Sequence, residues 1–201
     1  MAYYVDAYLV DLEQLHQLYG SHNLTVAHEI EQRFAEDIAR ASETIDDLNV
    51  ELHELGESPV PTVLEALHAS LAGQSPAERE RQPYWFALRL LCQHLGTTLP
   101  NEQFFGLQGD GVKFIEEDIE AIANLVFHSP PPGPIAFPKE LYLSVGHMTS
   151  QQAAERLADR KPGVFSDDED DRAWERAVCE QFYAWLEAAV DNHKSIVTFF
   201  W

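Results

Sequence analysis

The acidic run Ser166–Asp171 is the stretch of this sequence that most resembles a cation-binding site. Carboxylates are the ligands that a hard cation such as calcium prefers, but the glycine and the distal bidentate glutamate of a calcium loop are missing here. The run directly precedes an apolar helical pattern that begins at Trp174, where acidic side chains cap N–H groups and favour the positive end of the helix dipole. The pattern favours capping and solubility over a metal site. The third interpretation is a contact with a basic partner protein, which we expect to involve Asp167, Asp168 and Glu169.

The nine histidines are the next residues with chemical potential, as metal ligands or as general bases. No HxH or HExxH motif occurs, and no histidine pair at i, i+4 lies on one helical face, so the sequence predicts no metal site. His147 has the most site-like position, because Gly146–Thr149 is expected to be a loop between a strand and a helix. We therefore predict that His147 is a further partner contact.

Motifs for nucleophilic catalysis are absent from the sequence. It has no GxSxG elbow, and the glycine-rich segment Gly106–Gly111 lacks the Lys-Ser/Thr of a phosphate-binding loop, which favours a turn. Cys92 and Cys179 fall inside apolar helical patterns without CxxC or Cys/His spacing, so both are expected to be buried and unpaired. The sequence thus predicts no catalytic residue and no cofactor.

The composition is strongly acidic. Lys and Arg number 13 against 34 Asp and Glu, for a formal net charge of -21. This charge repels phosphate backbones and anionic lipid, which disfavours nucleic acid and membrane partners. Solubility, a basic partner protein and cation binding remain as explanations. No apolar run is long enough to span a membrane, and the N-terminus lacks the pattern of a secretory signal, so we expect a cytoplasmic protein.

Two stretches at the ends of the sequence must form the sheet. Ala2–Val10 and Ser195–Trp201 are rich in β-branched and aromatic residues, which predicts two buried strands paired in one sheet, parallel or antiparallel. By the same reasoning, Phe199, Phe200 and Trp201 are expected in the core. A third strand is predicted at Leu141–Val145.

Helical spacing of apolar residues organises most of the remaining chain. The strongest pattern predicts a helix that carries Val26, Ile30, Phe34 and Ile38 on one face. A central core helix is predicted from Pro83 to Gly96. Further helices are predicted at 11–20, 45–56, 63–73, 112–126, 149–160 and 174–193, and the proline-rich segment 128–138 is expected to be an extended loop.

Several of these segments together resemble a known family. They are Tyr3–Tyr8, Tyr84–Gly96, Phe137–Thr149 and Val197–Trp201, and in this order the chain is similar to an uncharacterised family of bacterial cytoplasmic proteins known as a domain of unknown function. A more distant likeness is to YfbM-like proteins. The resemblance implies one domain and a bacterial cytosolic setting, and it brings no catalytic residues. Trp201 stands where that family would have a histidine, which discourages assigning a catalytic group there.

These observations predict an α+β protein in which a small central sheet contains the N- and C-terminal strands, with six to seven packed helices. We expect residues 1–201 to form a single domain. The sequence favours an acidic, non-catalytic interaction module, such as an immunity or antitoxin-like binder of a basic partner. The alternatives are an enzyme with a dispersed active site and a small-molecule sensor or structural module. The oligomeric state is left open.

Overall fold

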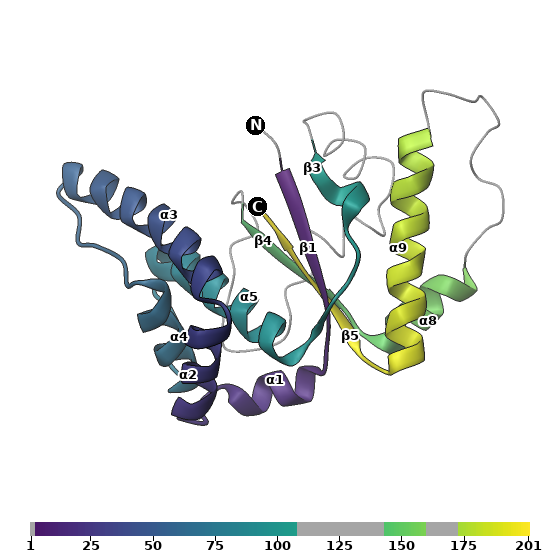
Figure 1. The fold of residues 1–201 in the computed structure, drawn as a ribbon, viewed down its shortest axis with the longest axis horizontal. Coiled ribbons are helices and arrows are strands. Elements are labelled where there is room, and N and C mark those ends of the chain that lie inside the picture. The colour runs from purple at the N-terminus through teal and green to yellow at the C-terminus, as the bar shows by residue number, and fades with distance from the viewer. Residues whose placement is uncertain (1–2, 108–142, 160–172) are drawn as a thin grey trace. The chain divides into compact units, whose positions relative to one another are not determined.

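The structure is a computed structural model that describes residues 3–107, 143–159 and 173–201 (Figure 1). These residues form two compact units. One unit contains the sheet and is made of residues 3–11, 96–107, 143–159 and 173–201. The other is helical and spans residues 12–95.

The sheet is organised around the pairing of its first and last strands. β1 (Tyr3–Val10) and β5 (Ser195–Phe200) run antiparallel, and Val5 lies opposite Phe200. Both strands consist mainly of β-branched and aromatic residues, which suit a buried, pleated surface. The prediction that the terminal stretches pair in one sheet is therefore confirmed, and the structure adds their direction.

Three further strands complete a five-stranded antiparallel sheet. β4 (Ser144–Met148) pairs with β5, and the short strands β2 (Thr97–Thr98) and β3 (Phe105–Leu107) pair with β1. The strand order is β2-β1-β5-β4, with β3 also beside β1. Together with seven α-helices in the described residues, this sheet confirms the α+β class.

The boundaries of β4 correct two predictions. The strand covers Ser144–Met148 rather than Leu141–Val145, of which residues 141 and 142 lie outside the described ranges. The segment expected to be a loop at Gly146–Thr149 is consequently mostly strand. The reason is the ladder with β5, which extends until Met148 faces Ile196. The helix predicted from residue 149 is confirmed directly after it, where Thr149 and Gln152 form a capping box at its start.

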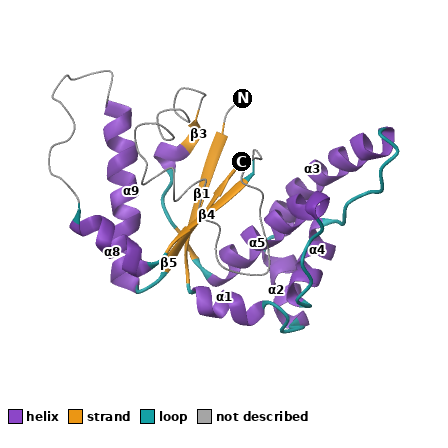
Figure 2. Ribbon diagram, turned by 180° about the vertical axis from the view of Figure 1, so that it is seen from behind, coloured by secondary structure: helices purple, strands orange, loops and turns teal. Residues whose placement is uncertain are grey.

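Two helices lie along one side of the strands, as Figures 1 and 2 show. They are α8 (Ser150–Ala158) and α9 (Ala173–Asn192). The apolar pattern predicted to begin at Trp174 is buried in α9 at Val178, Phe182, Trp185 and Ala189, whereas Trp174 itself is 37% exposed. The rest of this core comes mainly from one face of the strands and from the segment after β2, through Val5, Ala7, Leu9, Leu99, Phe104, Met148, Ile196 and Phe200.

Trp201 differs from the core position that was expected for it. Phe199 and Phe200 are buried as predicted, but Trp201 is 41% exposed. Its indole packs against Tyr4 in a tilted arrangement with ring centroids 5.0 Å apart, and its Nε1 donates a hydrogen bond to Asp6 at 3.1 Å. Trp201 follows the last residue of β5, so one side of its ring faces solvent.

The helical unit contains five α-helices, which are α1 (Leu12–Leu18), α2 (Leu24–Arg33), α3 (Ala35–Glu54), α4 (Val63–Leu71) and α5 (Arg81–Leu95). Helix α5 buries Tyr84, Trp85, Leu88, Leu91 and Cys92, as expected of a central helix. The helix predicted through Val26 and Ile38 is interrupted at Phe34, whose φ of -117° and ψ of 31° end α2 and begin α3. Ile30 of α2, Phe34 at the break and Ile38 of α3 are all buried.

Two glycines allow the end of α1 to meet the end of α4. Gly20 and Gly73 both have positive φ, of 73° and 77°. A Cβ on Gly73 would lie 3.1 Å from the Cα of Gly20, closer than side chains normally pack. The N–H of Gly20 donates to the carbonyl of Ser70, and the N–H of His22 donates to the carbonyl of Leu71. The two backbones can approach this closely because glycine has no side chain and tolerates positive φ.

Several predictions lie outside the described residues. They are the helix at 112–126, the proline-rich loop 128–138 and the acidic run 166–171. Among the described helices, none combines the length and the apolar character that a bilayer crossing requires.

Candidate interaction surface

Helix α3 is anchored at one end and exposed at the other. Its buried residues are Ile38, Ala41 and Ile45, so none of the last nine residues of the helix is buried. What holds this half to the unit is partly polar. Asn49 accepts a hydrogen bond from the N–H of Val60 at 2.7 Å and donates one to its carbonyl at 3.3 Å. These two hydrogen bonds hold the segment between α3 and α4 against α3, and the outer side of the helix stays exposed to solvent.

The exposed half of α3 and the turn after it are acidic and unneutralised. Counting Glu43 just before it, six carboxylates here are exposed, namely Glu43, Asp46, Asp47, Glu51, Glu54 and Glu57. From Ala41 to Glu78 the sequence contains no Lys or Arg. Within the described residues, the ion pairs of the helical unit involve other carboxylates, such as Glu36 with Arg40 at 3.9 Å. These six form what we call the acidic face of α3.

The spacing of the acidic face acts against the stability of α3. Asp47 and Glu51 are four positions apart, and Glu51 and Glu54 three, so like charges are neighbours on the helix surface. Glu51 and Glu54 also lie in the last turn, where the negative end of the helix dipole disfavours carboxylates. Each such contact costs about 0.2 to 1 kcal/mol. A positively charged partner would relieve both effects.

A line of leucines runs beside the acidic face. Leu48, Leu52 and Leu55 are spaced four and three positions apart, which places them on one side of the helix. Leu48 and Leu52 are half-buried, and Leu55 is 75% exposed at the helix end. We call these three residues the leucine ridge. Val50 is 60% exposed on the acidic face itself.

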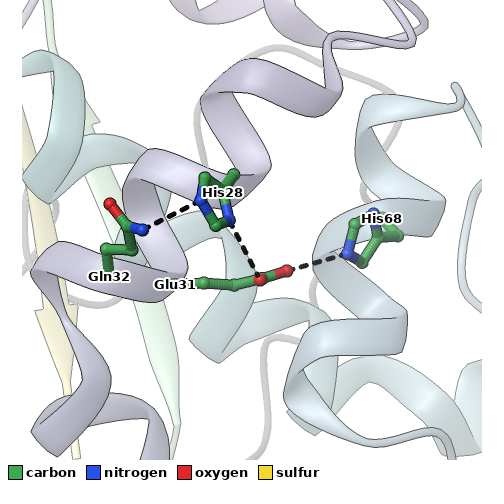
Figure 3. Close-up of polar contacts among 4 residues, drawn as sticks. All are labelled: His28, Glu31, Gln32 and His68. Carbon is green, nitrogen blue, oxygen red and sulfur yellow. Dashed lines mark hydrogen bonds and ion pairs between the residues drawn. The ribbon is translucent and has the colours of Figure 1, made fainter.

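A second polar feature joins α2 to α4, as Figure 3 shows. The carboxylate of Glu31 lies between two histidine rings, 3.0 Å from Nε2 of His68 and 4.0 Å from Nδ1 of His28. Gln32 Nε2 lies 2.9 Å from Nε2 of His28. Because an amide nitrogen only donates, Nε2 of His28 is the acceptor in this contact. The cluster is a hydrogen-bonded clip between two helices.

Helix α5 is joined to α2 and α3 by similar pairs. His94 Nε2 lies 3.6 Å from the carboxylate of Glu29, and Gln93 Nε2 donates to Asp37 at 3.3 Å. The remaining polar atoms of the two side chains, Oε1 of Gln93 and Nδ1 of His94, are buried without a hydrogen-bond partner among the described residues. These pairs position α2, and thereby the start of α3, on the central helix.

Two titratable groups of the helical unit, Cys92 and Tyr19, are poorly suited to nucleophilic chemistry. Burial raises the pKa of the Cys92 thiol well above its ordinary value. Burial, and secondarily the nearby Cys92, also raises the pKa of the Tyr19 phenol. Both groups are held neutral, the less nucleophilic form. Within residues 3–107, 143–159 and 173–201, no three or more His, Cys, Asp and Glu side chains are grouped so as to hold a metal ion.

Of the predicted partner-contact residues, only His147 lies within the described residues. His147 is half-buried in β4, opposite Val197 of β5, which in turn lies opposite Tyr8 of β1. It is therefore a strand residue rather than the loop residue that was expected. Asp167, Asp168 and Glu169 lie outside the described residues.

The acidic face and the leucine ridge were not predicted from the sequence. The spacing of Ile45, Leu48, Leu52 and Leu55 predicted the helix over 45–56, but it did not indicate which of these residues would be exposed. The signal that distinguishes this segment is the absence of Lys and Arg from Ala41 to Glu78. Only the packing of α3 shows that its leucines extend beyond the core.

Comparisons with known proteins give one match. A family described as "Domain of unknown function (DUF7691)" matches residues 1–201. The comparisons with curated proteins and with solved structures found no match. The bacterial setting and the likeness to YfbM-like proteins stay predictions.

Proposed function

We propose, from the premise that this chain belongs to the family described as a domain of unknown function (DUF7691), that it is a non-catalytic interaction module that binds a basic protein partner. The mode of action would be that of an immunity or antitoxin-like inhibitor, which covers a positively charged surface of its target. The catalytic and sensor alternatives are the competing proposals.

The observation that carries the proposal is the acidic face of α3. Its carboxylates are exposed, the segment around them lacks Lys and Arg, and the spacing costs the helix stability. Natural sequences break local rules mainly where function requires it. With a formal net charge of -21, the protein would attract a basic partner over roughly 8 to 10 Å at physiological salt and so speed the encounter.

We assign the acidic run the same role as the acidic face. Asp167, Asp168 and Glu169 are proposed to steer the partner, and Asp170 and Asp171 to cap the helix that follows. His147 is proposed as a further polar contact, although its half-buried strand position limits it to the part of its side chain that solvent reaches.

The test is affinity capture followed by reconstitution with the purified partner. The wild type is compared with Asp47→Asn/Glu51→Gln/Glu54→Gln, which neutralises part of the acidic face. A matched control, Glu155→Gln/Glu180→Gln/Glu187→Gln, removes the same charge from exposed positions on α8 and α9. We expect a basic partner whose association rate falls with added salt and falls in the first variant more than in the control. A neutral or acidic partner, or binding indifferent to salt, would overturn the proposal.

A further inference from the structure

We propose that the leucine ridge of α3 is the docking site for an amphipathic basic helix of the partner. This inference rests on the proposed function and specifies the part of the partner that is recognised. The partner helix would place apolar residues against Leu48, Leu52 and Leu55 and its lysines or arginines against Glu51 and its neighbours.

The apolar half of the argument is the geometry of the ridge. Leucines at i, i+4 and i+7 present one continuous line along a helix, the spacing by which helices read one another. In this protein the line is covered at its start and uncovered at its end, because Leu48 and Leu52 are half-buried and Leu55 is 75% exposed. Covering Leu55 removes apolar surface from water and supplies binding free energy without further folding.

The charged half of the argument selects the occupant. Glu51 lies three positions from Leu48 and four from Leu55, so it borders the ridge, and Asp47 and Glu54 border Glu51 on its other side. An amphipathic helix with Lys or Arg beside its apolar face complements this arrangement. A second copy of the same face would place carboxylates against carboxylates, and like charges brought together oppose association.

The same charges predict a link between stability and binding. In the free protein, Glu51 repels Asp47 and Glu54, and the helix end repels Glu51 and Glu54. A basic helix would remove these repulsions when it binds. Neutralising Asp47, Glu51 and Glu54 should therefore stabilise the free protein and weaken docking. General damage to the fold would not produce these opposite effects.

The experiment uses the full chain and a synthetic peptide of about 18 residues, or five helical turns, with leucines on one face and lysines on the other. Binding is followed by fluorescence anisotropy of the labelled peptide. A peptide with the lysines replaced by glutamates and a peptide of the same composition in scrambled order serve as controls. We expect the wild type to bind the lysine helix only, more weakly at high ionic strength.

Substitutions locate the site. Leu55→Ser is expected to weaken peptide binding about tenfold, the effect of losing most of one leucine contact. Leu24→Ser, at a residue 68% exposed on α2, is the matched control and should leave binding unchanged. Asp47→Asn/Glu51→Gln/Glu54→Gln should weaken binding while its melting temperature rises. Thermal melts of each variant check that the fold is intact.

The two proposals fail in different ways. Suppose that the captured basic partner binds Leu55→Ser as tightly as wild type and binds Asp47→Asn/Glu51→Gln/Glu54→Gln less tightly. In that case the docking inference is wrong and the proposed function stands. If no basic partner and no lysine helix binds the wild type, both are wrong. Binding of the scrambled peptide with equal affinity, or dimerisation lost in Leu55→Ser, would overturn the inference.

Discussion

Thr62 and Glu65 show how two side chains define a helix start. The hydroxyl of Thr62 accepts from the N–H of Glu65 at 3.2 Å, and the carboxylate of Glu65 accepts from the N–H of Thr62 at 2.7 Å. The Thr62 hydroxyl also donates to this carboxylate at 3.0 Å. The hydrogen bond from the Thr62 N–H first, and that from its hydroxyl second, lower the pKa of Glu65. The ionised form is therefore favoured in the folded state. Thr149 and Gln152 make the same contacts at α8 with a side chain that does not titrate.

The pair of capping boxes gives a pH-dependent prediction. Glu65→Ala should lower the free energy of unfolding by about 0.5 to 1 kcal/mol at neutral pH. Because the folded-state pKa is lowered, this contribution is present above the ordinary glutamate pKa of about 4.3 and is lost as the pH falls through the folded-state value. Urea denaturation at neutral and acidic pH measures it. The control Gln152→Ala should lose a similar amount at both pH values, and a pH-independent loss for Glu65→Ala would contradict the prediction.

Phe199 and Trp201 give a second prediction at the residue scale. Phe199 is fully buried and Trp201 is 41% exposed. Phe199→Ala should cost about 3 to 5 kcal/mol of stability. Trp201→Ala should cost about 1 to 2 kcal/mol, through the loss of its ring contact with Tyr4 and its hydrogen bond to Asp6. Chemical denaturation of both variants separates the two values. Equal losses would show that the ring of Trp201 is buried after all.

At the scale of elements, α3 has favourable charges at its start and unfavourable charges at its end. Glu36 lies in the first turn, near the positive end of the dipole, and pairs with Arg40. Glu54 lies in the last turn. The same helix therefore offers two equal substitutions with opposite expected signs.

The substitution Glu54→Lys should raise the free energy of unfolding by about 0.5 to 1 kcal/mol, and Glu36→Lys should lower it by a similar amount. For a chain of this length the melting temperature should shift by about 2 to 4 °C per kcal/mol. Calorimetry checks both signs. If both variants moved in the same direction, net charge rather than the position in α3 would control stability.

The break between α2 and α3 shows that helical periodicity alone does not determine where one helix ends and the next begins. Val26, Ile30, Phe34 and Ile38 keep helical spacing across the break, so their periodicity gives no sign of it. Phe34 makes no side-chain cap, and neither glycine nor proline stands there. The change of direction depends on what the buried faces pack against.

At the scale of the whole molecule, the chain is divided into two compact units. We propose that these two units nevertheless form a single domain over residues 1–201. Each unit holds one buried cysteine, Cys92 in the helical unit and Cys179 in the sheet unit. Buried thiols react only after their surroundings open. The two cysteines therefore report on the two units separately.

We expect both cysteines to become reactive at the same urea concentration, as one cooperative domain requires. The measurement is thiol labelling across a urea series, with Cys92→Ala and Cys179→Ala to assign each signal. Labelling of one cysteine at a lower urea concentration than the other would show two domains that unfold independently.

Local patterns determined the features of this protein that depend on neighbours in sequence. The terminal strands, the capping box at Thr149 and the buried stripe of α9 were predictable, because strand composition, capping and helical periodicity act over a few residues. The acidic composition was likewise legible, and it led to the proposed class of partner.

Long-range packing decided the rest. The antiparallel direction of β1 and β5, the extent of β4 and the link between Glu31 and His68 all join residues that are distant in sequence, and no local propensity encodes them. The exposure of the leucine ridge was decided in the same way. A leucine at helical spacing is a core residue only where another element covers it, and α3 extends beyond its cover after Ile45.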